Sequence, residues 1–92
     1  MAKWLRSGLR RDVCVVVASE GTPTAQECKA ALESHYGDRI DPKTFYGALE
    51  ALTDRGHLTR RADGIDDRYE LTEGGERALT EHRAWLRAAL SD

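Results

Sequence analysis

The fold of this chain is decided by the stretch DPKTFYGALEALTDRG, residues 41–56. Asp41 is a residue type that caps helix N-termini, and Pro42 is favoured at the first helical position, where its missing N–H costs nothing. Ile40 and Phe45 occupy the two positions of a hydrophobic staple. Gly56 suits the left-handed conformation that closes a helix. The stretch therefore predicts a helix with both ends defined.

This predicted helix has two different faces. Its apolar stripe has the spacing of a surface packed on a core and consists of Phe45, Ala48, Leu49 and Leu52. The opposite face carries polar residues and a glycine: Lys43, Thr44, Tyr46, Gly47, Glu50 and Asp54.

Two more helices are predicted before this stretch. The first runs from about Trp4 or Ser7 to Glu20, with leucines and valines at helical spacing and Gly21 at its end. The second begins after Thr24, which forms a capping box with Glu27, and Gly37 is its expected left-handed terminator.

After Gly56 the hydrophobic period changes to two. Residues 57–62 and 68–72 are predicted to be strands, and the Asp63-Gly64 pair between them favours a hairpin turn. Thr72 caps a last helix over about residues 73–89. Gly74 and Gly75 each weaken its first turn by roughly 1 kcal/mol relative to alanine. Their presence therefore predicts that another part of the backbone approaches closely.

Three helices, a hairpin and a final helix are the layout of a winged helix-turn-helix, a mainly α fold with a small β-hairpin. We expect one domain over residues 1–92, with a three-helix core and wing at about 8–72 and a dimerisation helix at about 73–90. In such a fold the third helix enters the major groove of DNA, and arginines on the wing contact phosphates.

The motifs on these elements resemble a known family. TFYGALEAL at 44–52, followed by GHL at 56–58, is similar to the recognition-helix signature of the PadR transcriptional regulators, and YELTEGG at 69–75 is similar to their strand-to-helix signature. DDRY at 66–69 resembles PadR-like regulators from salt-loving archaea. The resemblance covers about residues 8–90. It implies a homodimer, joined partly by its last helix, that binds operator DNA. We expect such a regulator to act as a repressor, although the sequence itself does not distinguish repression from activation.

The predicted DNA-binding residues lie on two elements. Those at the third helix are Arg39, Lys43, Thr44, Tyr46 and Gly47, and those on the wing are Arg60, Arg61 and Arg68. Each group has an alternative to DNA contact. Tyr46 could instead pack on the second helix. The wing arginines could instead pair across the hairpin with Asp63, Asp66, Asp67 or Glu70. A basic N-terminal cluster adds either a backbone contact or a solvated surface: Lys3, Arg6, Arg10 and Arg11.

The wing tip departs from the family pattern because it is acidic and apolar. Its sequence is DGIDD at 63–67. This composition argues against deep insertion of the wing into the minor groove.

The predicted dimerisation surface combines the first and last helices. Its residues are Leu5, Leu9, Leu79, His82, Trp85, Leu86 and Leu90. A small domain gains stability from a partner because it buries little of its own surface. Some PadR proteins hold flat hydrophobic ligands between interface tryptophans, so the resemblance implies two roles for Trp85: interface packing or contact with a small-molecule effector.

Composition limits the remaining classes of function. The 92 residues contain 14 basic and 16 acidic side chains, a net charge of −2 that by itself does not indicate nucleic-acid binding. The longest apolar run, residues 13–18, is too short to cross a membrane, so we expect a cytoplasmic protein. The sequence has no recognisable arrangement of catalytic residues, so we expect neither enzymatic activity nor a cofactor.

The cysteines and histidines are interpreted as structural. Cys14 and Cys28 have the spacing of small core residues, although a redox sensor on the same dimer remains an alternative. His35, His57 and His82 have no spacing typical of metal ligands. The main rival to DNA binding is a winged-helix module that binds proteins, which the acidic wing favours.

Overall fold

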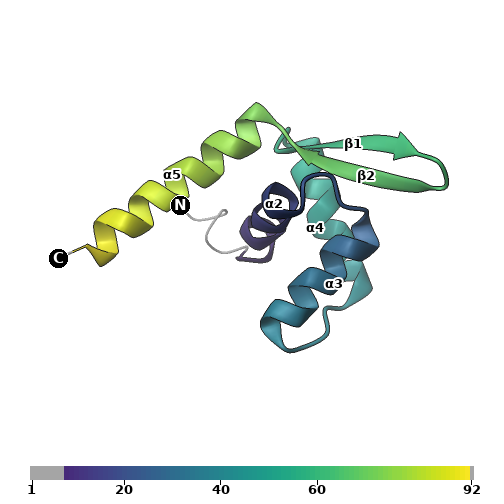
Figure 1. The fold of residues 1–92 in the computed structure, drawn as a ribbon, viewed down its shortest axis with the longest axis horizontal. Coiled ribbons are helices and arrows are strands. Elements are labelled where there is room, and N and C mark those ends of the chain that lie inside the picture. The colour runs from purple at the N-terminus through teal and green to yellow at the C-terminus, as the bar shows by residue number, and fades with distance from the viewer. Residues whose placement is uncertain (1–7, 92) are drawn as a thin grey trace.

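The computed structural model describes residues 8–91, which form four helices and one antiparallel hairpin (Figure 1). This confirms the predicted mainly α class. In chain order the elements are α2 (Gly8–Glu20), α3 (Ala25–Tyr36), α4 (Pro42–Asp54), β1 (Leu58–Asp63), β2 (Asp66–Leu71) and α5 (Glu73–Leu90).

The hydrophobic core lies where α2, α3 and α4 meet the base of the hairpin. The buried residues are Val13, Cys14, Val17, Cys28, Leu32, Phe45, Leu49, Leu52, Leu58 and Tyr69. Most of α5 lies outside this core and projects away from the other helices (Figure 1). Within the described part of the chain, no helix is long and apolar enough to span a bilayer.

The helix ends follow the predicted caps. Thr24 accepts a hydrogen bond from the backbone of Glu27 at 3.1 Å, and Glu27 accepts one from the backbone of Thr24 at 2.9 Å. Gly37 has a φ of 70°, the left-handed conformation expected after α3. The Asp41 carboxylate accepts a hydrogen bond from the backbone of Thr44 at 3.0 Å. These caps fix both helices of the helix-turn-helix.

The hairpin is longer than predicted. The cross-strand pairs run from Leu58 with Leu71 to Asp63 with Asp66, so the connection is only Gly64 and Ile65. Gly64 has a φ of 67° and Ile65 has a negative φ, which fits a type II′ turn. The predicted strand limits were wrong because aspartates are poor strand formers, whereas the short turn keeps the ladder paired to its tip.

The first turn of α5 is seated against the connection between α4 and β1. The Thr72 hydroxyl lies 2.6 Å from the carbonyl of Gly56 and accepts a hydrogen bond from the backbone of Gly75. A Cβ placed on Gly75 would lie 2.3 Å from the carbonyl oxygen of His57, whereas one on Gly74 would lie 3.4 Å from its nearest neighbour. The close approach predicted from the glycine pair is confirmed, and Gly75 is the residue that requires it.

Candidate nucleic-acid interface

The polar face of α4 lines a groove that it shares with the hairpin. Lys43, Tyr46 and Gly47 of α4 lie in this groove together with Arg60 of β1. We call these four residues the reading groove. Acidic side chains, Glu50 and Asp54, line the groove as well. The structure therefore brings together four of the eight predicted DNA-binding residues from two elements.

Tyr46 presents an aromatic ring to this groove. The residue is 46% exposed, and its ring meets that of Phe45 edge-on with 5.4 Å between the ring centroids. Phe45 is fully buried, so the Tyr46 ring packs on a side chain that the core holds in place. A supported, exposed ring of this kind contacts a partner at a low cost in conformational entropy.

Gly47 lies in the middle of α4, and the structure gives no internal reason for a glycine there. A Cβ added to it would meet nothing within 4 Å, and its backbone has no positive φ. An exposed glycine inside a helix costs about 1 kcal/mol relative to alanine. This cost is explained if another molecule must approach the helix backbone at the groove.

Thr44 and Arg39 lie outside the reading groove. The Thr44 hydroxyl donates to the Asp41 carboxylate at 3.2 Å, so this side chain belongs to the cap of α4. Arg39 is exposed in the connection just before α4. Its position suits contact with a phosphate beside the helix terminus.

Arg60 and Arg61 are the most accessible cations of the hairpin described in the structure. Their side chains are 60% and 63% exposed, and their ion pairs are long: 3.7 Å from Arg60 to Asp67, and 3.8 Å from Arg61 to Glu70. Pairing across the hairpin is thus present, as one alternative predicted. Exposed ion pairs of this kind are weak and are readily exchanged for a phosphate. As neighbours on a strand, the two arginines point to opposite faces.

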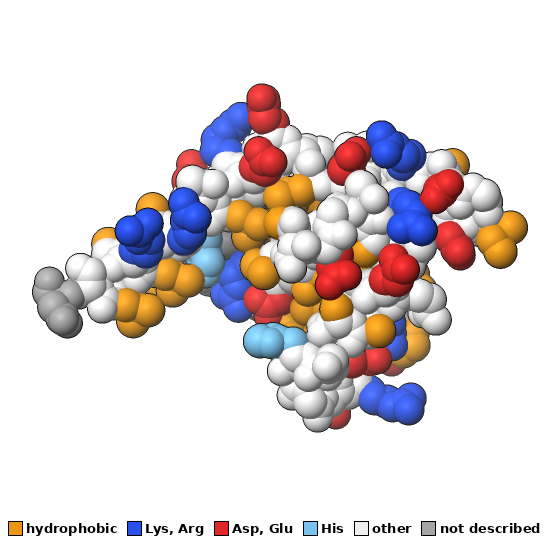
Figure 2. Space-filling view, in the orientation of Figure 1, with side chains coloured by type: hydrophobic (Ala, Val, Ile, Leu, Met, Phe, Trp, Pro, Cys, Tyr) orange, Lys and Arg blue, Asp and Glu red, His pale blue; other side chains and the backbone are white. Residues whose placement is uncertain are grey.

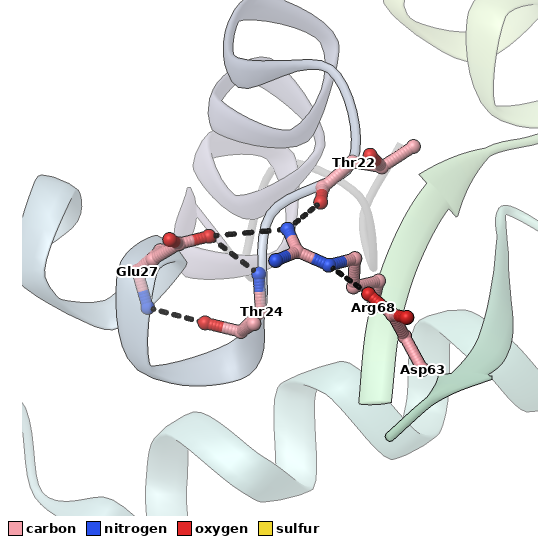
Figure 3. A network of polar contacts seen from close by, with 5 residues as sticks. All are labelled: Thr22, Thr24, Glu27, Asp63 and Arg68. Atoms are coloured by element: carbon pink, nitrogen blue, oxygen red, sulfur yellow. Dashed lines mark hydrogen bonds and ion pairs between the residues drawn. The ribbon is translucent and has the colours of Figure 1, made fainter. Parts of the chain in front are cut away.

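Arg68 has a different environment, shown in Figure 3. Its Nε donates to Asp63 at 2.7 Å, and its Nη1 donates to the carbonyl oxygen of Thr22 at 2.8 Å. The same Nη1 lies 3.6 Å from Glu27, the residue that completes the cap of α3. The hydrogen bond to Asp63 is the largest cause of a raised pKa for Arg68. Pairing of Arg68 with Asp63 was one of the alternatives predicted from the sequence. The contacts with Thr22 and Glu27 were not predicted, because both residues are more than 40 positions away along the chain.

The predicted dimerisation residues divide into two groups. Leu9 and Leu79 pack against the core of their own chain, which the sequence did not distinguish from an interface role. Trp85, Leu86 and Leu90 are 52%, 39% and 79% exposed on α5. Figure 2 shows hydrophobic side chains gathered along one edge of the projecting helix and basic ones along the other. These three exposed residues form what we call the α5 stripe.

Two further predictions concern residues near this surface. His82 is half-buried and lies beside Trp85, with 5.7 Å between ring centroids. Leu5 lies outside the described residues, as do Lys3 and Arg6 of the basic cluster. In the same cluster Arg10 is half-buried, and Arg11 pairs with Asp12 at 3.2 Å.

Cys14 and Cys28 are buried in the core, as the sequence predicted. Burial raises the pKa of each thiol to about 12, with smaller contributions from Cys28 at Cys14 and from Glu20 at Cys28. Both thiols therefore remain protonated at neutral pH, and a thiol is a much weaker nucleophile than a thiolate. Among residues 8–91, no group of histidine, cysteine and carboxylate side chains has the arrangement of a metal site.

We expect both cysteines to resist a thiol reagent in the folded protein. In native buffer at neutral pH, Ellman's reagent should modify them much more slowly than free cysteine, and unfolding in denaturant should make both react. The colour released in the two conditions provides the measurement. Modification in native buffer at the rate of free cysteine would support the redox-sensor alternative.

Comparison with known proteins gives structural matches only. No protein-family model matches the chain, and no curated protein sequence matches it. RosR of H. salinarum superimposes with a TM-score of 0.85 at 22% identity, over 94% of this chain and 79% of that one. A winged-helix DNA-binding protein from STIV matches with a TM-score of 0.77 at 16% identity, over 97% of both chains.

A third match agrees with the family resemblance in the sequence. A PadR family transcriptional regulator from Eggerthella lenta superimposes with a TM-score of 0.69 at 24% identity, over 92% of this chain and 81% of that one. Together the three likenesses show the fold: residues 8–91 form a winged helix, in which the hairpin β1–β2 is the wing.

Proposed function

We propose that this protein is a sequence-specific, double-stranded DNA-binding transcriptional regulator that acts as a homodimeric repressor in the cytoplasm. It uses no cofactor and catalyses no reaction. The observation that carries the proposal is the exposed Gly47 beside Lys43 and Tyr46 on a well-capped helix, facing the groove toward the wing. The structural matches to a winged-helix DNA-binding protein and to a PadR family transcriptional regulator support the same conclusion.

Each part of the interface has a distinct role in this proposal. The first turns of α4 enter the major groove, where Lys43 and Tyr46 contact base edges and Gly47 allows the helix to approach closely. Arg60 contacts the DNA from within the reading groove, whereas Arg61, on the opposite face of the hairpin, contacts a phosphate and contributes affinity without sequence preference. The chain carries a net charge of −2, so we expect a shallow dependence of affinity on salt.

A gel-shift titration tests the proposal most directly. The probes are the DNA upstream of the protein's own gene and a mixed-sequence duplex of equal length, each at two salt concentrations. We expect tighter binding to the upstream DNA. If neither duplex binds at low salt, the protein-interaction module becomes the better interpretation.

Gly47→Ala separates stability from DNA binding. The free energy of unfolding of this variant should exceed that of wild type by up to about 1 kcal/mol. Alanine favours a helix, and the added methyl group meets open space. It should nevertheless bind DNA more weakly, because that methyl group occupies the reading groove. Thermal unfolding and the gel shift measure the two effects.

Ser34→Ala is the matched control. Ser34 is exposed on α3 and lies outside the reading groove, so its replacement also favours the helix while leaving the groove unchanged. We expect wild-type DNA affinity from this variant. Equal affinities for Gly47→Ala and wild type would show that DNA does not approach α4 at this position.

A further inference from the structure

The wing is joined to the helix-turn-helix by a small polar cluster centred on Arg68 (Figure 3). We call this cluster the wing joint; it consists of Thr22, Thr24, Glu27, Asp63 and Arg68. The guanidinium group connects three segments: the tip of β1, the loop between α2 and α3, and the first turn of α3. The backbone of β2 pairs with the same loop, since Tyr69 donates to the carbonyl of Pro23 at 3.0 Å.

The outer half of the wing has little else to hold it in place. Every residue from Thr59 to Asp67 is exposed, and the buried side chains of the hairpin, Leu58 and Tyr69, lie at its base. A two-stranded hairpin is only marginally stable by itself in water. The angle between the wing and α4 must therefore depend strongly on the polar contacts of the wing joint.

Arg68 is poorly placed to bind a phosphate. Its Nε and Nη1 already make charge-assisted or short hydrogen bonds, and its side chain is only 36% exposed. Arg61 lies directly opposite in the strand register, is 63% exposed, and has only an ion pair of 3.8 Å. A phosphate at Arg68 would compete with Asp63 for the guanidinium group, whereas one at Arg61 would replace a weak surface contact.

We propose that Arg68 is a positioning residue for DNA binding, which holds the wing at the angle where Arg61 reaches a phosphate while α4 lies in the major groove. This inference rests on the proposed function. It replaces the prediction that Arg68 itself contacts DNA. It also assigns a favourable role to Asp63, a negative charge at the interface, because Asp63 orients Arg68.

The dependence of affinity on salt distinguishes positioning from phosphate contact. The slope of log K against log salt is negative. With a mixed-sequence duplex as the probe, Arg61→Ala should reduce the magnitude of this slope by about 0.9, the value for one lost phosphate contact. Arg68→Ala should weaken binding by about five- to tenfold at every salt concentration, because the wing must be ordered on binding, and should leave the slope unchanged. An equal reduction in the magnitude of the slope in both variants would overturn the inference.

A second substitution, at Asp63, provides an independent test, because the two interpretations of Arg68 predict opposite changes in DNA affinity. Asp63→Ala removes a negative charge near DNA and frees Arg68, so a phosphate-binding Arg68 would make this variant bind more tightly. Positioning predicts weaker binding. Asp66→Ala, the matched control, removes the same charge from the residue paired with Asp63 in the register, and it should bind as tightly as wild type or slightly more tightly.

Arg68→Lys keeps the charge and loses the planar fork. A lysine makes a phosphate contact but cannot reach Asp63 and Thr22 in the same geometry. It should therefore behave like Arg68→Ala in affinity. Wild-type affinity from the lysine variant would indicate a phosphate contact and contradict positioning.

Hydrogen exchange in the free protein tests the wing joint without DNA. The backbone amides of β1 and β2 should exchange faster in Arg68→Ala than in wild type, while those of Arg61→Ala should keep the wild-type rates. Unchanged exchange in Arg68→Ala would refute the joint even if the variant binds DNA weakly. If wild type binds neither duplex while exchange responds as expected, the proposed function fails and the structural role of the wing joint stands.

Discussion

Gly75→Ala is expected to destabilise the protein by roughly 3 kcal/mol, in the upper part of the range for overpacking. The added Cβ would lie 2.3 Å from the carbonyl oxygen of His57 and 2.7 Å from Cδ1 of Leu71. Leu71 can move aside, but His57 is held by the hydrogen bond that its carbonyl accepts from the backbone of Thr72. We therefore expect the midpoint of thermal unfolding to fall by about 12–24 °C.

Gly74→Ala is the control for the adjacent position. Its Cβ would lie 3.4 Å from the carbonyl oxygen of Gly56, an ordinary contact. Alanine is also the better helix former, so this variant should lie within about 1 kcal/mol of wild type. Circular dichroism during heating compares the two proteins. Equal midpoints would show that α5 is not seated on His57 as described.

Trp85→Glu combined with Leu86→Glu is expected to convert the proposed homodimer into a folded monomer. Both residues belong to the α5 stripe, and neither is part of the hydrophobic core. Two carboxylates placed in an apolar interface lose their hydration without gaining partners, which costs several kcal/mol. Light scattering should give half the wild-type mass, while circular dichroism should retain the helical signal.

The matched control places the same two charges on the other side of α5. Thr80→Glu combined with Ala84→Glu changes residues that are exposed and lie opposite the stripe on the helix. This variant should keep the dimer mass. A wild-type monomer, or a dimer that survives both pairs of substitutions, would show that the stripe does not join the subunits.

Local signals in the sequence were sufficient to predict the helices and their N-terminal caps. The caps at Thr24 and Asp41 were correct because each depends on residues within one helical turn. The glycine pair in α5 was correctly associated with a close approach. The difference between Gly74 and Gly75 depends on where His57 lies in space, and no local pattern contains that information.

The wing was predicted less completely than the helices. The aspartates near its tip favoured a long loop, whereas the two-residue turn allows the strands to pair up to Asp63 and Asp66. Arg68 was grouped with Arg60 and Arg61 because all three are arginines on the same hairpin. Their different roles depend on contacts with Thr22 and Glu27, which only the folded chain brings near Arg68.

The seat of α5 has a consequence for the spacing of operator half-sites. An 18-residue helix is about 27 Å long, so a tilt of about 10° at its first turn moves its far end by about 5 Å. In the proposed homodimer, the direction of α5 determines where the partner subunit lies. That direction is fixed at the contact between Gly75 and His57, the pivot about which α5 would tilt. Half-sites of helix-turn-helix dimers lie about 34 Å apart, one turn of DNA. The pivot thus helps to set which spacing the two copies of α4 can read together.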